Sequence, residues 1–170
     1  MADEPLSPQE SHLWQCWRLA SEAVMARVTR DISAGTGLSG PDYAVLARLH
    51  YLGRGELRQQ DLAESMRWDK SRLSHHLTRM EGRALIRRRA GPGKGVTVVL
   101  SAAGRKQLAA ATPVHARAVR LHLVSRLDDA QRQALLSLSQ LLHDVAPVEA
   151  WSPDDSSGSS GVAPDASGAP

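Results

Sequence analysis

The apolar residues of this chain recur at helical spacing along most of its length and at strand spacing in one short part. Steps of three and four between apolar positions predict helices over residues 11–33, 41–52, 57–66, 70–81, 101–125 and 128–146. The period changes to two over residues 84–89 and 96–100, which predicts two strands joined by the Gly-Pro-Gly-Lys-Gly turn at 91–95. We therefore expect a mainly α-helical protein with one small β-hairpin.

The order of the middle elements (helix, helix, strand, glycine turn, strand) is that of a winged helix-turn-helix. In a helical projection of residues 70–81, Leu73, Leu77 and Met80 fall within about 60° of one another, and Asp69 can cap the first turn. The opposite side carries hydrogen-bond donors and cations, which suit it to base edges and phosphates in a groove of DNA. We expect DNA contacts from Lys70, Ser71, Arg72, Ser74, His75, Thr78 and Arg79.

The predicted hairpin is suited to be the wing of such a domain. Lys94 stands alone among the small residues of the turn, where it can enter a minor groove. Arg87, Arg88 and Arg89 lie on the preceding strand, where they can neutralise phosphates. Because side chains alternate along a strand, some of these three arginines must face away from DNA, and the sequence leaves open which ones.

The charge distribution supports a nucleic-acid partner. The 170 residues carry a net charge of only +3, but Arg54 to Lys106 holds 13 Lys and Arg against 5 Asp and Glu, a net +8, and the remainder carries −5. A basic segment between acidic ends predicts a module that binds a polyanion. The length fits one domain, no apolar run approaches the roughly 18 residues of a membrane span, and no signal peptide is evident, so we expect a cytoplasmic protein.

Several short motifs follow one another along the chain in the same order as the motifs of a known protein family. These motifs are Leu62-Ala63, Trp68 to Leu73, Leu77 to Glu81, Leu85-Ile86 and Leu100 to Gly104. On these residues the chain resembles the MarR family of bacterial transcription regulators over about residues 11–146. The resemblance implies a homodimer whose two reading helices enter successive major grooves of a pseudo-palindromic operator, with each wing in a flanking minor groove. It also implies a repressor that a small-molecule effector releases from DNA. The family's wing often carries Asp-x-Arg, whereas here Lys94 stands in place of the arginine and the aspartate is missing.

The expected organisation follows from the resemblance and from composition. We expect a flexible N-terminus over residues 1–10, a MarR-like domain over 11–146 and a disordered tail over 147–170, where 13 of 24 residues are Ser, Gly or Pro. Within the domain, residues 41–101 form the DNA-binding winged helix, and the helices of 11–34 and 101–146 form a dimerisation scaffold.

Two other functions compete with sequence-specific regulation. Certain relatives sense organic hydroperoxides through one cysteine on the first helix, hydrogen-bonded by tyrosines; here Cys16 lies on the first helix, and Tyr43 and Tyr51 lie on the second. A buried, inert cysteine is the simpler interpretation. An architectural protein that coats DNA without sequence preference is the other alternative.

The remaining candidate chemistry points to packing. His75 and His76 project about 100° apart on a helix and cannot hold one metal ion together, and His115 and His122 are two turns apart, so we expect neither metal nor cofactor. Trp14 and Trp17 suit a dimer core better than an effector cavity. The chain has no phosphate-cradling loop, nucleophile elbow or zinc-protease motif, and we do not expect an enzyme.

Overall fold

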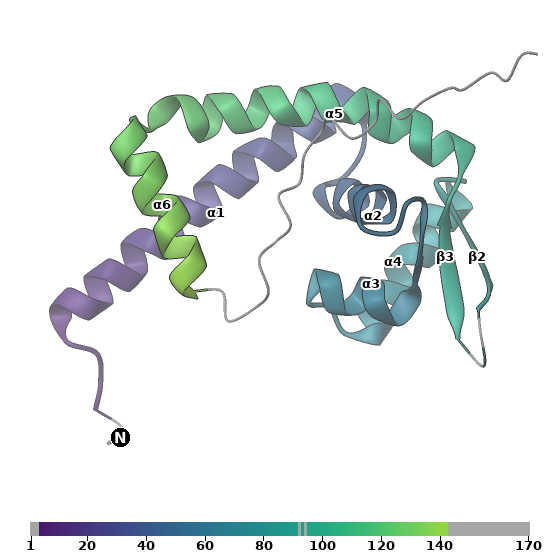
Figure 1. The fold of residues 1–170 in the computed structure, drawn as a ribbon, viewed down its shortest axis with the longest axis horizontal. Helices are drawn as coiled ribbons and strands as arrows, with labels where there is room; N and C mark the ends of the chain where they lie inside the picture. The colour runs from purple at the N-terminus through teal and green to yellow at the C-terminus, as the bar shows by residue number, and fades with distance from the viewer. Residues whose placement is uncertain (1–3, 92, 94, 143–170) are drawn as a thin grey trace, which may run out of the picture. The chain divides into compact units, whose positions relative to one another are not determined.

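The computed structural model describes residues 4–91, 93 and 95–142 (Figure 1). In this part the elements are α1 (Pro8–Thr36), α2 (Gly40–Tyr51), β1 (Glu56–Arg58), α3 (Gln59–Met66), α4 (Lys70–Gly82), β2 (Ile86–Ala90), β3 (Val96–Leu100), α5 (Ala102–His122), a 3-10 turn (Val124–Arg126) and α6 (Asp129–Leu142). Residues up to Gln133 form one compact unit, and those from Ala134 belong to a second. The expected tail, the end of the last helix, Pro92 and Lys94 lie outside the described residues.

The sheet confirms the predicted wing and adds a strand that the pattern did not predict. Its order is β1-β3-β2 and all pairs are antiparallel, with Arg88 opposite Val98 in the hairpin and Leu57 opposite Val98 on the other side. The expected helix over 57–66 is therefore wrong at its start. A strand of three residues is too short to show alternation, and it exists because β3 supplies the hydrogen-bonding partner.

Short polar motifs fix where the helices begin. Asp69 accepts the amide hydrogen of Arg72 at 2.7 Å and caps α4 as predicted. A capping box, in which the side chains of Ser7 and Glu10 each accept the other's backbone amide hydrogen, starts α1 at Pro8, three residues before the predicted start. Residues 8–10 are therefore helical, in contrast to the loose N-terminus expected over 1–10. Pro113 does not end α5, which runs through it to His122.

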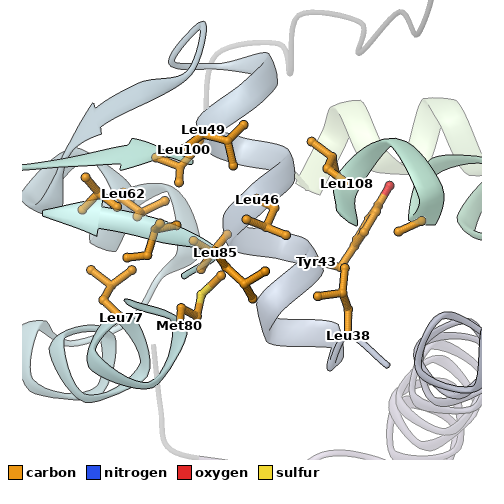
Figure 2. Packing of buried hydrophobic residues seen from close by; sticks show 14 of the residues in the cluster. Leu38, Tyr43, Leu46, Leu49, Leu62, Leu77, Met80, Leu85, Leu100 and Leu108 are labelled. Atoms are coloured by element: carbon orange, nitrogen blue, oxygen red, sulfur yellow. The ribbon is translucent and has the colours of Figure 1, made fainter. Parts of the chain in front are cut away.

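The core of the winged helix lies between α2, α3, α4 and the sheet. Leu73, Leu77 and Met80, the predicted inward residues of α4, are all fully buried. Figure 2 shows Leu77 and Met80 turned toward Leu46 of α2 and toward Leu85. This packing fixes the rotation of α4 about its axis, so that its polar side is directed outward.

The junction between wing and scaffold depends on the start of α5. The Ser101 hydroxyl lies 2.6 Å from the carbonyl oxygen of Ala84 and 2.9 Å from that of Leu85, to which it donates, and it accepts the amide hydrogen of Gly104. A Cβ at Gly104 would collide with the Leu85 carbonyl oxygen, so only glycine permits this approach. The Ser-Ala-Ala-Gly segment therefore seats α5 against the chain entering β2.

The scaffold part of this unit is formed by α1 and α5. The two helices pack along each other, and His122 Nε2 lies 2.8 Å from Asp31 Oδ2. The hydrogen bond with His122 lowers the pKa of Asp31. No helix in the described ranges is long and apolar enough to cross a membrane.

Candidate nucleic-acid interface

The residues of α4 that we expect to contact DNA lie on one side of this helix. Ser74 is half-buried, and the other predicted contact residues of this helix are exposed: Lys70, Ser71, Arg72, His75, Thr78 and Arg79. Two arginines, one lysine and several short hydroxyl side chains thus share a convex surface with an apolar underside. Such a face can place donors at base edges and cations at phosphates.

Arg72 is held in position over an aromatic ring. Its guanidinium carbon lies 4.2 Å from the centroid of the Trp68 ring. Trp68 is half-buried against the core in the turn before α4. A stacked guanidinium keeps its N–H groups at the edge of the plane, where they remain available to an acceptor.

The structure separates the three wing arginines. Arg88 faces α4, where its Nη2 and Nε lie 2.8 and 2.9 Å from Glu81 Oε2 and its Nη2 lies 3.1 Å from Thr78 Oγ1. The side-chain and backbone hydrogen bonds from Arg88 lower the pKa of Glu81. By alternation Arg87 and Arg89 lie on the other face of the hairpin, and Arg89 pairs with Glu56 at 2.8 Å.

Arg87 is the wing arginine with the most freedom. Its side chain is exposed and makes no hydrogen bond or ion pair within the described ranges. Lys94, the predicted tip residue, is outside those ranges. The structure therefore brings the α4 residues together in one surface, turns Arg88 toward that surface, and places Arg87 and Arg89 on a separate face.

A buried polar cluster behind α4 escaped the sequence analysis. His76 and Asp42 are 6% and 3% exposed, and His76 Nε2 lies 3.2 Å from Asp42 Oδ1 without the alignment of a hydrogen bond. Arg83 Nη1 donates to Asp42 Oδ2 at 2.7 Å. Burial opposes the charged form of Asp42, but hydrogen bonds from Arg83 and Ser39 outweigh it, so the pKa of Asp42 is lowered. The signal in the sequence was the position of His76 beside Leu77 on the inward arc of the helix.

A shallow groove adds two residues that sequence reasoning missed. Gln59, Gln60, Lys70 and Val96 line an open depression of about 170 Å³ where α3, α4 and β3 begin. The groove adjoins the reading face through Lys70. Amide side chains at this place can donate to a phosphate oxygen.

The structure also places the residues considered for other functions, namely the cysteine and tyrosine of a peroxide sensor and the possible metal ligands. Cys16 is exposed, not buried as expected, and its Sγ lies 3.5 Å from His12 Nε2. Tyr43 is buried and stacks on His115 with 4.8 Å between ring centroids. Burial raises the pKa of Tyr43 to about 12 and lowers that of His115. Among the described residues no group of three or more His, Cys, Asp or Glu is arranged to hold a metal ion.

Comparison with known proteins extends this description. Residues 38–93 match the sequence model of the MarR family. AbsC, a MarR family transcriptional regulator from Streptomyces coelicolor, is 29% identical, with 82% of this chain and 93% of AbsC covered and a TM-score of 0.74. Sco3205, another from the same organism and solved in complex with DNA, is 27% identical, with 82% and 90% covered and a TM-score of 0.73.

A more distant structure shares the fold alone. BpsR of Bordetella bronchiseptica, whose DNA binding is regulated by 6-hydroxynicotinic acid, is 20% identical, with 78% of this chain and 99% of BpsR covered and a TM-score of 0.68. No curated protein sequence matches this chain.

The polar face of α4, the wing and the order of the helices define a winged-helix protein that binds DNA. The family match covers α2, α3, α4 and β2, and solved family members share the fold over four-fifths of the chain. Residues 38–93 thus match the MarR family, and the chain is similar to solved MarR family transcriptional regulators over four-fifths of its length, which supports a DNA-binding transcriptional regulator.

Proposed function

We propose that this regulator is a homodimeric repressor of a pseudo-palindromic operator. The observation that carries the proposal is the face of α4, whose exposed residues are all polar or cationic while the underside is fully buried. A dimer would set two such helices about 34 Å apart, one turn of B-DNA, so that both enter the major groove on one side of the duplex.

Each predicted contact residue has a role that its position suits. Arg72 and Arg79 are exposed forks for guanine edges, with Ser71, Ser74, His75 and Thr78 as shorter donors between them. Lys70 would contact a phosphate at the start of α4, together with Gln59 and Gln60. Arg87, Arg89 and Lys94 would extend the contact to the wing, with Arg88 supporting Thr78 from behind.

The apolar residues exposed on α1 support the dimer. Trp14 and Trp17 are 55% and 44% exposed, and Leu13 and Met25 are exposed on the same helix. Side chains of this size are seldom left in water on a folded protein, and a second copy would cover them. We assign residues 11–34 and 101–146 to dimerisation and 41–101 to DNA binding, within a domain of 11–146.

Release by a small-molecule effector is the second part of the proposal. The Tyr43 hydroxyl is buried at the stack with His115, between α2 and α5, and has no hydrogen-bond partner among the described residues. A polar group in that state favours a ligand that accepts its hydrogen. Since α2 belongs to the winged helix and α5 to the scaffold, a ligand there would change the angle between them and hence the spacing of the reading helices.

The decisive experiment is selection of bound fragments from a random DNA library by the full chain. The selected sequences are expected to show two inverted half-sites with centres about ten base pairs apart, and footprinting to show one bounded site. Binding measured against salt should separate the specific from the non-specific part of the affinity. Uniform protection and no preference over random DNA would support the architectural alternative, and a reporter behind the selected site distinguishes repression from activation.

A further inference from the structure

One edge of α4 carries both arginines of the reading face. At about 100° per residue, positions 72, 76 and 79 fall within about 60° of one another. Arg72 and Arg79 are exposed and His76 between them is buried. Trp68 precedes this edge by one turn, in the loop between α3 and α4, so the two arginines stand at the ends of a row formed by two aromatic rings.

The row is continuous through direct contacts between neighbouring side chains. The Arg72 guanidinium lies over the Trp68 ring at 4.2 Å. The rings of Trp68 and His76 meet edge to face, with centroids 5.5 Å apart and planes at 88°. Arg79 Nη2 lies 3.2 Å from His76 Nδ1. Each arginine therefore contacts a ring, and the two rings contact each other.

The chemistry of the last contact fixes the state of His76. An arginine can only donate, so Nδ1 must be the unprotonated acceptor and the neutral ring carries its hydrogen on Nε2, toward Asp42. Burial lowers the pKa of His76, which favours this neutral form. Asp42 lies in the capping box of α2 and is held by Arg83, so the row is anchored in the fold of the domain.

We propose that Trp68 and His76 are positioning residues that orient Arg72 and Arg79 for reading DNA, with Asp42 as their anchor. The inference rests on the proposed function, since it concerns how the same face achieves specificity. Neither Trp68 nor His76 needs to touch DNA; each acts through the arginine that it contacts.

The physical basis is pre-organisation. A free arginine side chain has several rotatable bonds, and fixing them on a base reduces the affinity gained. Stacking on Trp68 restricts Arg72 before DNA arrives and leaves the edge of its guanidinium free for two acceptors of one guanine. The hydrogen bond to His76 restricts Arg79 in the same way.

The test compares base discrimination between variants of the full chain, on the half-site found by library selection and on its single-base substitutions. Arg72→Ala is expected to relax one base position by roughly 5- to 150-fold. Trp68→Leu, which keeps apolar packing, is expected to relax the same position by roughly twofold to fivefold. Trp68→Tyr, which restores a ring face, should recover discrimination, and Met66→Leu, a volume-conserving change two residues away, is the matched control.

A double variant separates positioning from mere folding. If Trp68 acts through Arg72, then Trp68→Leu with Arg72→Ala discriminates no worse than Arg72→Ala alone. The proposal would be overturned if the losses of base discrimination in the two single variants multiplied in the double variant. It would also be overturned if Trp68→Leu relaxed discrimination at all base positions of the half-site. For the second arm, His76→Asn supplies an acceptor to Arg79 and is expected to keep the base preference lost on Arg79→Ala, whereas His76→Leu is expected to lose it.

A measurement without DNA separates failure of this inference from failure of the proposed function. In the free protein the NMR signal of the Arg72 Nε–H should be displaced by the Trp68 ring and move to the random-coil position in Trp68→Leu. If the Arg72 Nε–H signal of the folded wild type were not displaced, the positioning role of Trp68 would be overturned, and the proposed function in DNA binding would be unaffected. A displaced signal in a wild type that prefers no DNA sequence would overturn the proposed function and, with it, the role given to the stack.

Discussion

At the scale of single residues, the wing separates arginines that the sequence presents as equivalent. Arg88 is held by Glu81 and Thr78, whereas Arg87 is exposed on the opposite face without a partner in the described ranges. A cation that neutralises a phosphate releases a counterion, and a cation already paired with a carboxylate releases fewer. The two positions are therefore expected to differ in their effect on the salt dependence of binding.

We predict that Arg87→Ala lowers the slope of log affinity against log salt by about 1 for each half-site and weakens binding to all sequences alike. Arg88→Ala should leave the slope nearly unchanged and instead lower stability, because it removes the partner of Glu81. Fluorescence anisotropy with labelled duplex at several salt concentrations measures the slope, and urea unfolding measures stability. Equal slopes for Arg87→Ala and wild type would remove Arg87 from the DNA surface.

The buried His76 makes stability depend on pH. Burial lowers its pKa below the ordinary value in the folded chain, against the attraction of Asp42 and together with the repulsion of Arg79, Arg83 and Arg72. The unfolded chain therefore takes up a proton at this site at a higher pH than the folded chain does. Stability is expected to rise with pH in that window and to fall as the pH drops below about 6.5, until the folded ring is itself protonated.

The measurement is the melting temperature between pH 7.5 and pH 5 for wild type and His76→Asn. The variant lacks the titrating ring, so its melting temperature should fall less on acidification. His75→Asn, at the exposed neighbouring position, is the matched control and should keep the wild-type pH dependence. His115 is half-buried and its pKa is lowered by that burial, so part of the acid sensitivity is expected to remain in His76→Asn. A pH profile of His76→Asn identical to wild type would contradict the assignment.

At the scale of elements, the close packing of α5 against the backbone of Leu85 requires that residue 104 is glycine, without a Cβ. A Cβ at Gly104 meets backbone that cannot rotate away, and the Ser101 hydroxyl holds the same segment in place. We predict that Gly104→Ala lowers the free energy of unfolding by about 2–3 kcal/mol. Gly82→Ala, at the end of α4 with open space around it, should be neutral or stabilise by up to about 1 kcal/mol, since alanine favours the helix.

Urea unfolding of both glycine variants gives the comparison directly. A similar stability for the two variants would mean that the chain entering β2 moves to admit a methyl group.

The elements also show how far the sequence predicts this molecule. The periodicity located α2 and α4, the hairpin and the inward residues Leu73, Leu77 and Met80, because each buries one face against the core. It missed β1, whose three residues become a strand only when β3 lies beside them. Its helix over 57–66 was wrong at the start for that reason.

The candidate site also has one part that the sequence predicts and one part that it does not. The polar side of α4 was predictable, because a helix that buries one side must expose the other. The partners of Arg88 and His76 were not, because they are set by tertiary contacts with Glu81 and Asp42 that local spacing does not encode. His76 shows this limit of the sequence pattern. A histidine is not counted among apolar residues, so its buried position on the inward side of α4 was not predicted.

At the scale of the whole molecule, specificity is expected to require two copies, since one reading face covers only one half-site. Trp14 and Trp17 are exposed on α1, away from the buried core residues Val28 and Ile32 at the other end of that helix. Replacing both tryptophans by glutamate would place charge in the proposed interface without disturbing the winged helix. The variant Trp14→Glu with Trp17→Glu is therefore expected to fold and to be a monomer.

The mass of this variant by sedimentation should correspond to one chain at concentrations where wild type is a dimer. Its affinity for the selected operator should fall by about 100-fold or more, because the second half-site no longer binds with the advantage of linkage. Affinity for a single half-site should stay within a factor of about three, since α4 and the wing are unchanged. Leu52→Glu, at an exposed leucine after α2, is the matched control and should remain dimeric. If the tryptophan variant stayed dimeric and bound the operator like wild type, the N-terminal half of α1 would not be the dimer interface, and the spacing of the two reading helices would have to be set by other residues of the scaffold.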